Sequence, residues 1–496
     1  MIIAEINVSE LTTITEGIRP AISATIPAQV IEGFNDPTKW IRHDLWVETE
    51  FDTDGDGLPD RMHVSVTRPQ ATENGLKLPV IYNSSPYFAG TAKFEEGLFW
   101  DVKHELGEEG KARKHVKVER KGIRPVISTS KTTRWVPRGF IVVHSSAPGT
   151  GLSQGSPTVG GDNESLAPKA VIEWLGGKDN GYTSPYGGEK VQAYWSTGRV
   201  GMTGPSYEGT LPLAAATTGV DALKAVIPVA PNTSYYHYYR SNGLVRSPGG
   251  YLGEDIDVLY DFIHSGDESK RAYADRVYRD SIFAINMDRI TGDYNDFWKE
   301  RDMLYDMDNM KAALFMSHGF NDWNVMPEHS YRIYNKAREM GLPVKIYYHQ
   351  DGHGGPPPFD MMNEWFTKYL FEVDNNADEG PRAWIVRESD PRENPTAYED
   401  YPNPASDPVT LYLSGDGNSM GSLSMKKTRG RDKDVIIDDV SYSGAELAQQ
   451  QASEHRLMFT LPVLERDLHI SGIPEITIRL ASSKPATNLS VWLISL

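Results

Sequence analysis

Short runs of apolar residues recur along residues 78–349, and each is followed by a loop rich in glycine. The runs contain many Val and Ile residues and do not alternate with polar ones, which is typical of strands buried on both faces of a parallel sheet. Segments with helical periodicity separate the runs. This alternation predicts a doubly wound α/β domain, with strands at 78–82, 139–144, 199–202, 222–230, 312–317 and 344–349 and the clearest helices at 328–340 and 360–373.

Two segments interrupt this order and divide the 496 residues into domains. Residues 232–310 are rich in Tyr, Arg and Asp and have a helical pattern without a strand, so we expect a helical cap inserted into the core. Beyond residue 376, apolar and polar residues alternate, as in an antiparallel β-sandwich, with strands expected at 409–413, 438–442, 457–461, 476–480 and 489–496. We therefore expect an α/β core from residues 1–231, which include the N-terminal segment, and 311–375, a cap at 232–310 and a sandwich at 376–496. The chain ends on its last expected strand, so the sandwich is expected to be incomplete.

The charge and the absence of cysteine exclude several classes of function. The formal net charge of −18 argues against nucleic acid or an anionic membrane as a partner. Without cysteine the chain has no disulfides, no thiolate chemistry and no Cys-ligated metals. No stretch approaches the ~18 apolar residues of a membrane span. Residues 1–29 lack the apolar region of a signal peptide, so we expect a cytoplasmic protein, with a secreted protein whose signal was removed as the alternative.

Two serines lie between glycines in the manner of a hydrolase nucleophile. Residues 151–155 (GLSQG) match Gly-x-Ser-x-Gly, whereas in 204–209 (GPSYEG) the second glycine comes one residue late. A nucleophile elbow needs a strand, a sharp turn and then a helix. Ser206 has the expected strand before it and small residues after it, whereas Ser153 is soon followed by Pro157, which does not suit the start of a helix. We therefore predict Ser206 as the nucleophile; the alternative for its motif is an ordinary Gly/Ser loop.

The acid and the base of a serine hydrolase of this type follow the nucleophile along the chain. Asp322 comes directly after the strand expected at 312–317, and His353 lies in a glycine-flanked loop after the strand expected at 344–349. The imidazole takes the serine proton, and the carboxylate fixes its tautomer and stabilises its cation. We predict Asp322 as the acid and His353 as the base. His349 is the competing base, with a packed core group as its simpler interpretation, and His318 is expected as a structural neighbour of the acid.

Several motifs together resemble the Xaa-Pro dipeptidyl-peptidases, which share a superfamily with cocaine esterase and the α-amino-acid ester hydrolases. They are 204–210 (GPSYEGT), 318–325 (HGFNDWNV) and 238–250 (YYRSNGLVRSPGG) with 253–255 (GED). The resemblance extends over roughly residues 40 to 480. It implies an α/β-hydrolase core, a helical cap and a C-terminal jelly-roll sandwich. It also implies release of N-terminal Xaa-Pro dipeptides from peptides with a free N-terminus. Nothing in the sequence suggests a catalytic metal, and we expect no cofactor.

The same resemblance assigns further residues. It implies an oxyanion hole made by the backbone N–H of Tyr207 and the hydroxyl of Tyr87, which on pattern alone would be a core aromatic residue. It places Glu254 at the substrate's N-terminus, the alternative being a solvated charged pair with Asp255. It places Tyr235 and Tyr238 around the proline ring, where aromatic walls suit a flat apolar group.

The chain departs from the family pattern at three points. Pro205 stands where Lys is usual, and Tyr235 stands where we expect Trp, so the proline pocket is expected to differ. Larger members carry an additional N-terminal domain linked to dimerisation, for which this chain has no room. A homodimer therefore stays an open expectation.

Residues 52–60 (DTDGDGLPD) resemble a calcium loop. The Glu that closes an EF-hand loop is missing, so we interpret the segment as an Asx-rich hairpin turn without a metal. Two alternatives to the peptidase stay open: an esterase or acylase of the same superfamily, and a binding module attached to an inactive hydrolase domain.

Overall fold

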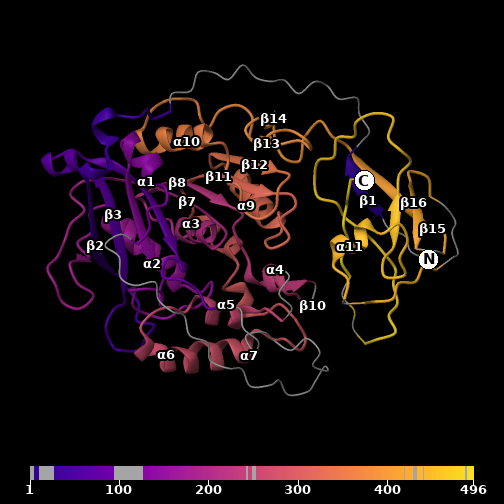
Figure 1. Ribbon diagram of the computed structural model, residues 1–496, viewed down its shortest axis with the longest axis horizontal. Coiled ribbons are helices and arrows are strands. Elements are labelled where there is room, and N and C mark those ends of the chain that lie inside the picture. The colour runs from indigo at the N-terminus through magenta and orange to yellow at the C-terminus, as the bar shows by residue number, and fades with distance from the viewer. Residues whose placement is uncertain are drawn as a thin grey trace. The chain divides into compact units, whose positions relative to one another are not determined.

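The computed structural model describes the backbone of two compact units (Figure 1). One unit comprises Pro20–Thr396, and the other comprises Met1–Arg19 and Ala397–Leu496. The residues that the structure describes are 5–9, 27–93, 127–241, 244–248, 253–417, 419–427, 433–439, 441–485, 487 and 489–495. Asn242, Gly243, Gly249 and Gly250 of the family-like stretch 238–250 lie outside these residues.

The larger unit is built on one sheet whose strands are β2 (Trp40–Glu48), β3 (Arg61–Pro69), β4 (Leu78–Ser85), β5 (Ile141–Ser146), β6 (Gly181–Tyr182), β7 (Ser196–Pro205), β8 (Leu223–Val229), β11 (Ala313–Gly319), β12 (Val344–His349), β13 (Ala383–Ile385) and β14 (Thr396–Tyr398). The order of these eleven strands is β14-β13-β12-β11-β8-β7-β4-β5-β3-β2-β6. Neighbours from β13 to β5 run parallel, and β3, β2 and β6 continue the sheet in antiparallel fashion.

All six strands expected in the core are confirmed, as β4, β5, β7, β8, β11 and β12. Residues of β4, β5 and β11 are buried along their whole length, which explains why these runs do not alternate. The short strands β13 and β14 were not expected. They belong to the large sheet, so the sheet continues past the expected boundary at residue 376. A three-residue strand is too short to show a period, and the pattern therefore could not reveal it.

Helices cover both faces of this sheet. They are α1 (Thr132–Trp135), α2 (Asn163–Leu175), α3 (Tyr207–Thr217), α9 (Glu328–Glu339) and α10 (Phe359–Phe371), of which α9 and α10 confirm the two clearest predictions. Both α3 and α10 pack against β4, β7 and β8, from opposite sides in Figure 1. A Cβ on Gly201 of β7 would lie 2.6 Å from the Phe366 ring, so this glycine lets α10 approach the sheet. No helix among the described residues has the length and apolar composition needed to cross a membrane.

The segment 232–310, predicted as a cap and called the cap segment or cap here, contains the short helices α4 (Tyr235–Tyr239), α5 (Ile256–Ile263), α6 (Glu268–Ala274), α7 (Ala284–Asn286) and α8 (Asp296–Lys299), and a π-helix at Asp275–Phe283. We expected no strand here, but β9 (Arg240–Ser241) and β10 (Leu244–Val245) form a small antiparallel ladder. Two residues per strand are too few to produce a recognisable alternation. The helical character of the segment is as predicted.

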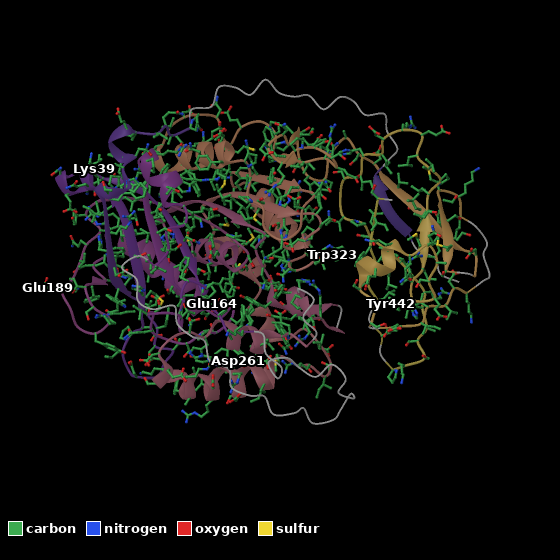
Figure 2. The ribbon with its side chains drawn as sticks, viewed as in Figure 1. Lys39, Glu164, Glu189, Asp261, Trp323 and Tyr442 are labelled. Atoms are coloured by element: carbon green, nitrogen blue, oxygen red, sulfur yellow. The ribbon has the colours of Figure 1, made fainter. Side chains whose placement is uncertain are left out.

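Buried ion pairs hold the cap together. Asp255, fully buried, lies 3.0 Å from Arg240 and 2.9 Å from Arg289. Asp261, labelled in Figure 2, lies 2.6 Å from Arg271 and 3.0 Å from Arg279. Removing one member of such a buried pair leaves an uncompensated charge and typically costs about 3–5 kcal/mol. The cap therefore depends on polar side-chain contacts to an extent that the parallel sheet does not.

The smaller unit contains one four-stranded sheet in the order β1-β15-β16-β17, formed by β1 (Glu5–Ser9), β15 (Pro408–Gly415), β16 (Met420–Ser424) and β17 (Met458–Thr460), with one helix, α11 (Gly444–Gln449). Strand β1 pairs with β15 from Glu5–Tyr412 to Ser9–Pro408. The sequence pattern groups the N-terminal segment with the α/β core. The pairing places its strand in the smaller unit instead, because backbone pairing joins segments that lie far apart in the sequence.

The expected sandwich is represented by this one sheet. Strands predicted at 409–413 and 457–461 are confirmed as β15 and β17. The described residues of 438–442, 476–480 and 489–495 contain no strand. Large apolar side chains stay exposed in the same region, among them Val463, Leu480 and Val491. A sandwich buries such side chains between two packed sheets, and the described residues form only one.

Candidate active site

Ser206 lies at the sharp turn between β7 and α3. Its backbone has φ 59° and ψ −129°, a conformation that costs a residue with a side chain of order 1–3 kcal/mol. Its N–H donates to the carbonyl of Val229 at 2.8 Å, which fastens the turn to β8. The turn thus has the strand-turn-helix setting that the sequence predicted for a nucleophile.

Two glycines explain why the second glycine of this motif comes late. A Cβ on Gly204 would lie 2.6 Å from the Cβ of Glu208, and a Cβ on Gly209 would lie 2.7 Å from the carbonyl oxygen of Val229. Gly209 thus lets the first turn of α3 press against β8. The close approach occurs one residue later than the Gly-x-Ser-x-Gly pattern assumes.

Ser153, in the motif with the regular spacing, uses its hydroxyl in two hydrogen bonds that hold its loop in place. Its hydroxyl donates to the carbonyl of Ser146 at 2.8 Å and accepts the backbone N–H of His63 at 2.9 Å. Its residue is 3% exposed. Both functions of the hydroxyl are therefore used in holding the loop to strands β3 and β5.

Asp322 lies in the loop after β11 and accepts four hydrogen bonds. Its Oδ1 accepts the backbone N–H groups of Asn324 and Val325 at 3.0 and 2.9 Å. Its Oδ2 faces His353 Nδ1 at 2.7 Å and His318 Nε2 at 3.1 Å. Burial alone would raise the pKa of this carboxyl, but the hydrogen bonds from the two histidines outweigh burial and hold its pKa well below the usual range. Asp322 is thus a buried carboxylate whose hydrogen bonds favour its charged form.

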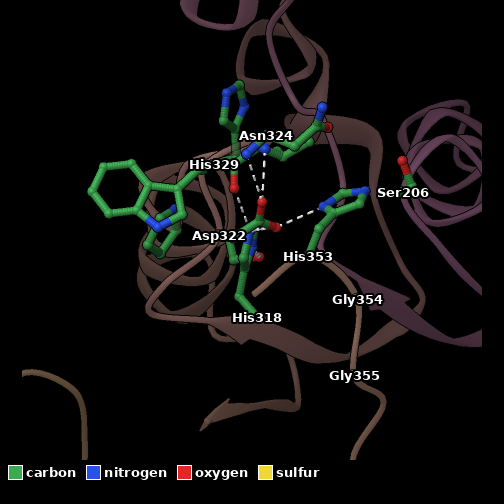
Figure 3. A network of polar contacts seen from close by, with 12 residues as sticks. Ser206, His318, Asp322, Asn324, His329, His353, Gly354 and Gly355 are labelled. Carbon is green, nitrogen blue, oxygen red and sulfur yellow. Dashed lines mark hydrogen bonds and ion pairs between the residues drawn. The ribbon is translucent and has the colours of Figure 1, made fainter. Parts of the chain in front are cut away.

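His353 lies between Asp322 and Ser206 in Figure 3, in the loop after β12. Its Nδ1 bonds to Asp322, and the far edge of its ring turns toward Ser206. The side chain is 32% exposed, whereas that of Asp322 is fully buried. The structure therefore brings the three predicted triad members together, with the base on the solvent side.

Both ring nitrogens of His349, the competing base, contact backbone atoms. Its Nε2 lies 3.0 Å from the carbonyl of Gly354, and its Nδ1 accepts the N–H of Asp351 at 3.2 Å. The residue is fully buried at the end of β12. These contacts fit the simpler interpretation of His349 as a packed group that shapes the loop carrying His353.

Tyr87 and Tyr207 lie beside each other next to the elbow. Tyr87 follows β4, and its ring meets the Tyr207 ring edge-on with centroids 6.0 Å apart. Burial, together with the carboxylates of Glu208, Glu254 and Glu164, raises the pKa of Tyr87, so its hydroxyl keeps the proton needed to donate a hydrogen bond. Among the backbone hydrogen bonds of the described residues, none uses the N–H of Tyr207, as is usual in the first turn of a helix.

The predicted proline-pocket residues come from α4 and are buried. Tyr235 is 2% exposed, and its ring centroid lies 6.3 Å from that of Tyr207. Tyr238 donates from its hydroxyl to the side-chain oxygen of Asn324 at 3.2 Å. The cap and the loop that carries the acid are therefore in direct contact. Tyr87, Tyr207, Tyr235 and Tyr238 belong to one cluster of packed aromatic side chains.

Glu254 and Asp255 do not form a solvated pair, so that alternative is wrong. Asp255 begins α5 and is tied to Arg240 and Arg289. Glu254 is only 9% exposed. Burial raises the pKa of Glu254 to about 8, with Asp255 adding to the rise and Arg246 opposing it. The two neighbouring carboxylates thus differ, since arginines neutralise Asp255 while Glu254 has no ion pair within the described residues.

Comparison with known proteins decides the family. A model of the family described as X-Pro dipeptidyl-peptidase (S15 family) matches residues 54–355. The chain belongs to this family. A second model, described as the X-Pro dipeptidyl-peptidase C-terminal non-catalytic domain, matches residues 375–496.

Relatives of this family member span most of its length. A protein from Rhodopirellula baltica is 59% identical over 472 residues, which are 95% of this chain and 75% of the relative. An Xaa-Pro dipeptidyl-peptidase from Lacticaseibacillus rhamnosus is 33% identical over 497 residues, 93% of this chain and 62% of its own. The crystal structure of a CocE/NonD family hydrolase from Staphylococcus aureus has a TM-score of 0.50 at 17% identity and covers 80% of this chain and 65% of that one. This last likeness concerns the fold.

One polar residue of the site was not predicted from the sequence. Glu164, in the first turn of α2 and labelled in Figure 2, is 3% exposed. Its two carboxylate oxygens accept the Tyr207 hydroxyl at 2.7 and 2.6 Å. Burial raises the pKa of Glu164. A glutamate near a helix start is common on surfaces, so nothing in the pattern distinguished it.

The aspartate-rich loop of this family member forms the turn between β2 and β3. The carboxylates of Asp52, Asp54 and Asp60 lie within 4.8 Å of one another. Asp52 accepts the N–H groups of Gly55 and Gly57 at 2.8 and 2.9 Å. Asp54 accepts the N–H of Asp56 at 3.2 Å and Asp56 accepts that of Leu58 at 2.9 Å, as in Asx turns. The Lys270 ammonium lies 3.2 Å from Asp54, and burial raises the pKa of Asp60 to about 7. Backbone N–H groups and one lysine thus contact these carboxylates, and a hairpin turn without a metal stays a prediction.

Proposed function

We propose that the chain releases Xaa-Pro dipeptides from the N-terminus of peptides, with Ser206 as nucleophile, His353 as general base and Asp322 as the orienting acid. Membership of the X-Pro dipeptidyl-peptidase family supports the reaction and peptide substrates with proline in the second position. One observation carries the assignment of residues. The 2.7 Å contact between Asp322 and His353 Nδ1 directs the other edge of the ring toward a serine in a nucleophile elbow.

The geometry supports acyl transfer in two steps. Ser206 Oγ attacks the carbonyl carbon of the substrate proline while His353 Nε2 takes the hydroxyl proton. The tetrahedral intermediate collapses, His353 gives this proton to the leaving amine, and the dipeptide stays bound as an ester of Ser206. Water then attacks the ester with His353 again as base. The Xaa-Pro dipeptide leaves with a free carboxylate, and Ser206 recovers its proton.

We assign the oxyanion hole to the backbone N–H of Tyr207 and the hydroxyl of Tyr87. Both donors lie beside the elbow, and the raised pKa of Tyr87 keeps its phenol protonated. Donors aimed at a developing oxyanion typically contribute about 100- to 1,000-fold to kcat. The bond from the Tyr207 hydroxyl to Glu164 holds the side chain away from the reacting atoms, so its backbone can face them.

The cap supplies substrate selection in this proposal. Tyr235 and Tyr238 provide the buried aromatic surface for the proline ring. Glu254 receives the free N-terminal ammonium. A buried carboxylate without an ion-pair partner gains most from an arriving cation. Losing such a pair typically costs about 2–5 kcal/mol. A carboxylate at a fixed distance from Ser206 would place the bond after the second residue of the peptide at the nucleophile.

We infer that the smaller unit is part of a jelly-roll β-sandwich with no catalytic role. Its match to the C-terminal non-catalytic domain supports this, as does its single sheet with many apolar side chains still exposed. In the larger unit, the helix-covered parallel sheet and the elbow support an α/β-hydrolase core with the segment 232–310 as its cap.

The test compares three substrates. Release of p-nitroaniline from Ala-Pro-p-nitroanilide and from its N-acetylated form is measured beside hydrolysis of p-nitrophenyl butyrate. We expect the free-amine substrate to be cleaved and the acetylated one to be resistant. Ser206→Ala should lower kcat on every substrate by several orders of magnitude, whereas Ser153→Ala, the matched control, should not. Turnover of the ester alone would favour the esterase alternative, and equal activity of Ser206→Ala and wild type would refute the nucleophile.

A further inference from the structure

A second histidine contacts the acid of the proposed triad. His318, at the end of β11, is fully buried. Its Nε2 lies 3.1 Å from Asp322 Oδ2 and 2.8 Å from the carbonyl of Val325. Its Nδ1 lies 2.6 Å from the hydroxyl of Ser330 on α9. A continuous line of contacts thus leads from α9 through His318 and Asp322 to His353 (Figure 3).

The partners of His318 settle which nitrogen carries its proton. A carboxylate and a carbonyl only accept hydrogen bonds, so Nε2 must be the donor. The Ser330 hydroxyl can donate to Nδ1, and this satisfies the other nitrogen of a neutral ring. A neutral His318 only donates a hydrogen bond to Asp322 and leaves its negative charge in place, whereas a cationic ring would neutralise it.

We propose that His318 is a positioning residue, set in its Nε2–H tautomer by Ser330, which fixes the orientation of Asp322 and tunes the basicity of His353. The proposal rests on the triad assigned above. The Asp322 Oδ2 atom divides its interaction between the two rings. Removing the His318 donor leaves more charge for His353 and also frees the carboxylate to turn. Basicity of His353 should therefore rise while the rate falls.

Other charged or titratable groups face this line and must be held constant. Arg246 of the cap acts electrostatically on Asp322, and His329 of α9 and His349 of β12 are in electrostatic contact with His318. None of them is altered in the variants below. A change in the pH profile can then be attributed to His318 and Ser330.

The experiment uses His318→Leu, which removes the donor, and His318→Gln, whose side-chain amide keeps an N–H near the position of Nε2. Profiles of kcat and KM against pH are measured on Ala-Pro-p-nitroanilide and p-nitrophenyl butyrate. His318→Leu should lower kcat by about 10- to 100-fold on both substrates, the usual range for one hydrogen bond to a charged group. KM should stay within about twofold, and the acid limb of kcat/KM should move upward by about half a pH unit. His318→Gln should recover most of the rate and the wild-type limb.

A double-mutant cycle separates positioning from packing. In the Asp322→Asn background, His318→Leu should cost less than about twofold, because the group through which His318 acts is already altered. Equal losses in both backgrounds, or equal damage by Leu and Gln, would assign His318 a packing role and overturn the proposal.

A second pair keeps the test decisive if His318→Leu does not fold. Ser330→Ala removes the hydroxyl that faces Nδ1, and Ser330→Thr retains one. We expect a loss in kcat of about threefold for Ala, within the range of one neutral hydrogen bond, and recovery for Thr. An unchanged kcat in Ser330→Ala would contradict the tautomer argument. If wild type fails on the peptide while the ester shows the His318 pattern, the substrate assignment fails and the positioning role stands.

Discussion

Backbone hydrogen bonds at the carboxyl ends of parallel strands place the proposed catalytic groups, whereas buried side-chain ion pairs hold the cap segment that carries the proposed substrate-binding residues. Two backbone N–H groups hold Asp322, and the carbonyl of Val229 holds the N–H of Ser206. In the cap, Asp255 next to Glu254 is held by two arginines. The first set of contacts depends on the path of the chain, and the second on particular side chains.

This difference in how the residues are held corresponds to a proposed difference in role, between the catalytic reaction and the selection of the substrate. Strand ends and tight turns permit few alternatives, so the reacting groups keep one geometry. A set of charged and aromatic side chains can exchange members and change what is bound while the sheet stays the same. We therefore expect substitutions near the elbow to affect every substrate, and substitutions in the cap to distinguish substrates with and without a free amine.

The largest effect among the variants that follow is expected from Tyr87→Phe. Removing an oxyanion donor should lower kcat by about 100- to 1,000-fold on the Ala-Pro anilide and on the butyrate ester alike, with little change in KM. Tyr82→Phe is the matched control. It removes a buried hydroxyl from β4, the strand that precedes Tyr87, one bonded to Ser145 at 2.6 Å, and should leave the rates unchanged. Steady-state kinetics on both substrates decide the point. A loss confined to the peptide substrate would mean that Tyr87 acts in substrate selection and not in the oxyanion hole.

Glu254→Gln should produce a smaller and selective effect. The loss of the ammonium partner should lower kcat/KM for Ala-Pro-p-nitroanilide by about 30-fold or more, equivalent to ~2 kcal/mol, and leave the ester within about twofold. Glu254→Asp retains the charge but shortens the reach, so it should lie between Gln and wild type. Competition assays with both substrates in one cuvette measure the ratio directly. An equal loss on the ester would mean that Glu254 serves the reaction on every substrate. The proposed division of roles between the strand ends and the cap would then be wrong.

The positions of the proposed catalytic residues were largely predictable from the sequence, and the reason is local. Each proposed residue follows a strand within a few residues, so the order strand, turn and helix locates it. The strand ends before Ser206, Asp322 and His353 were predicted, and β7, β11 and β12 are found there. Ser206 was preferred over Ser153 on the same local grounds, and the structure gives Ser153 two structural hydrogen bonds.

What could not be predicted depends on contacts between distant segments. Glu164 reaches Tyr207 from a helix 43 residues away, and Ser330 reaches His318 from the next helix. Arg289 meets Asp255 across 34 residues. The pairing of β1 with β15 joins Glu5–Ser9 to a strand that begins at Pro408. None of these partners has a periodic signal, because a single polar residue on a helix is equally compatible with the surface.

The smallest expected effect is on pH dependence, and its sign follows from Glu254. The pKa of this carboxyl is raised to about 8, so the group is mostly neutral below that pH and charged above it. The substrate amine, with a pKa of ~7.7–8.0, is charged below that range. The ion pair needs both charges, so the ratio of kcat/KM for the anilide to that for the ester should peak near pH 8 and fall about threefold at pH 7 and pH 9. In Glu254→Gln no ion pair can form at any pH, so the ratio should lose its maximum and stay nearly constant over this range. A ratio that stays flat in wild type would mean that the cap reads the peptide without an ion pair at Glu254, and that selection depends on the aromatic surface of Tyr235 and Tyr238 alone.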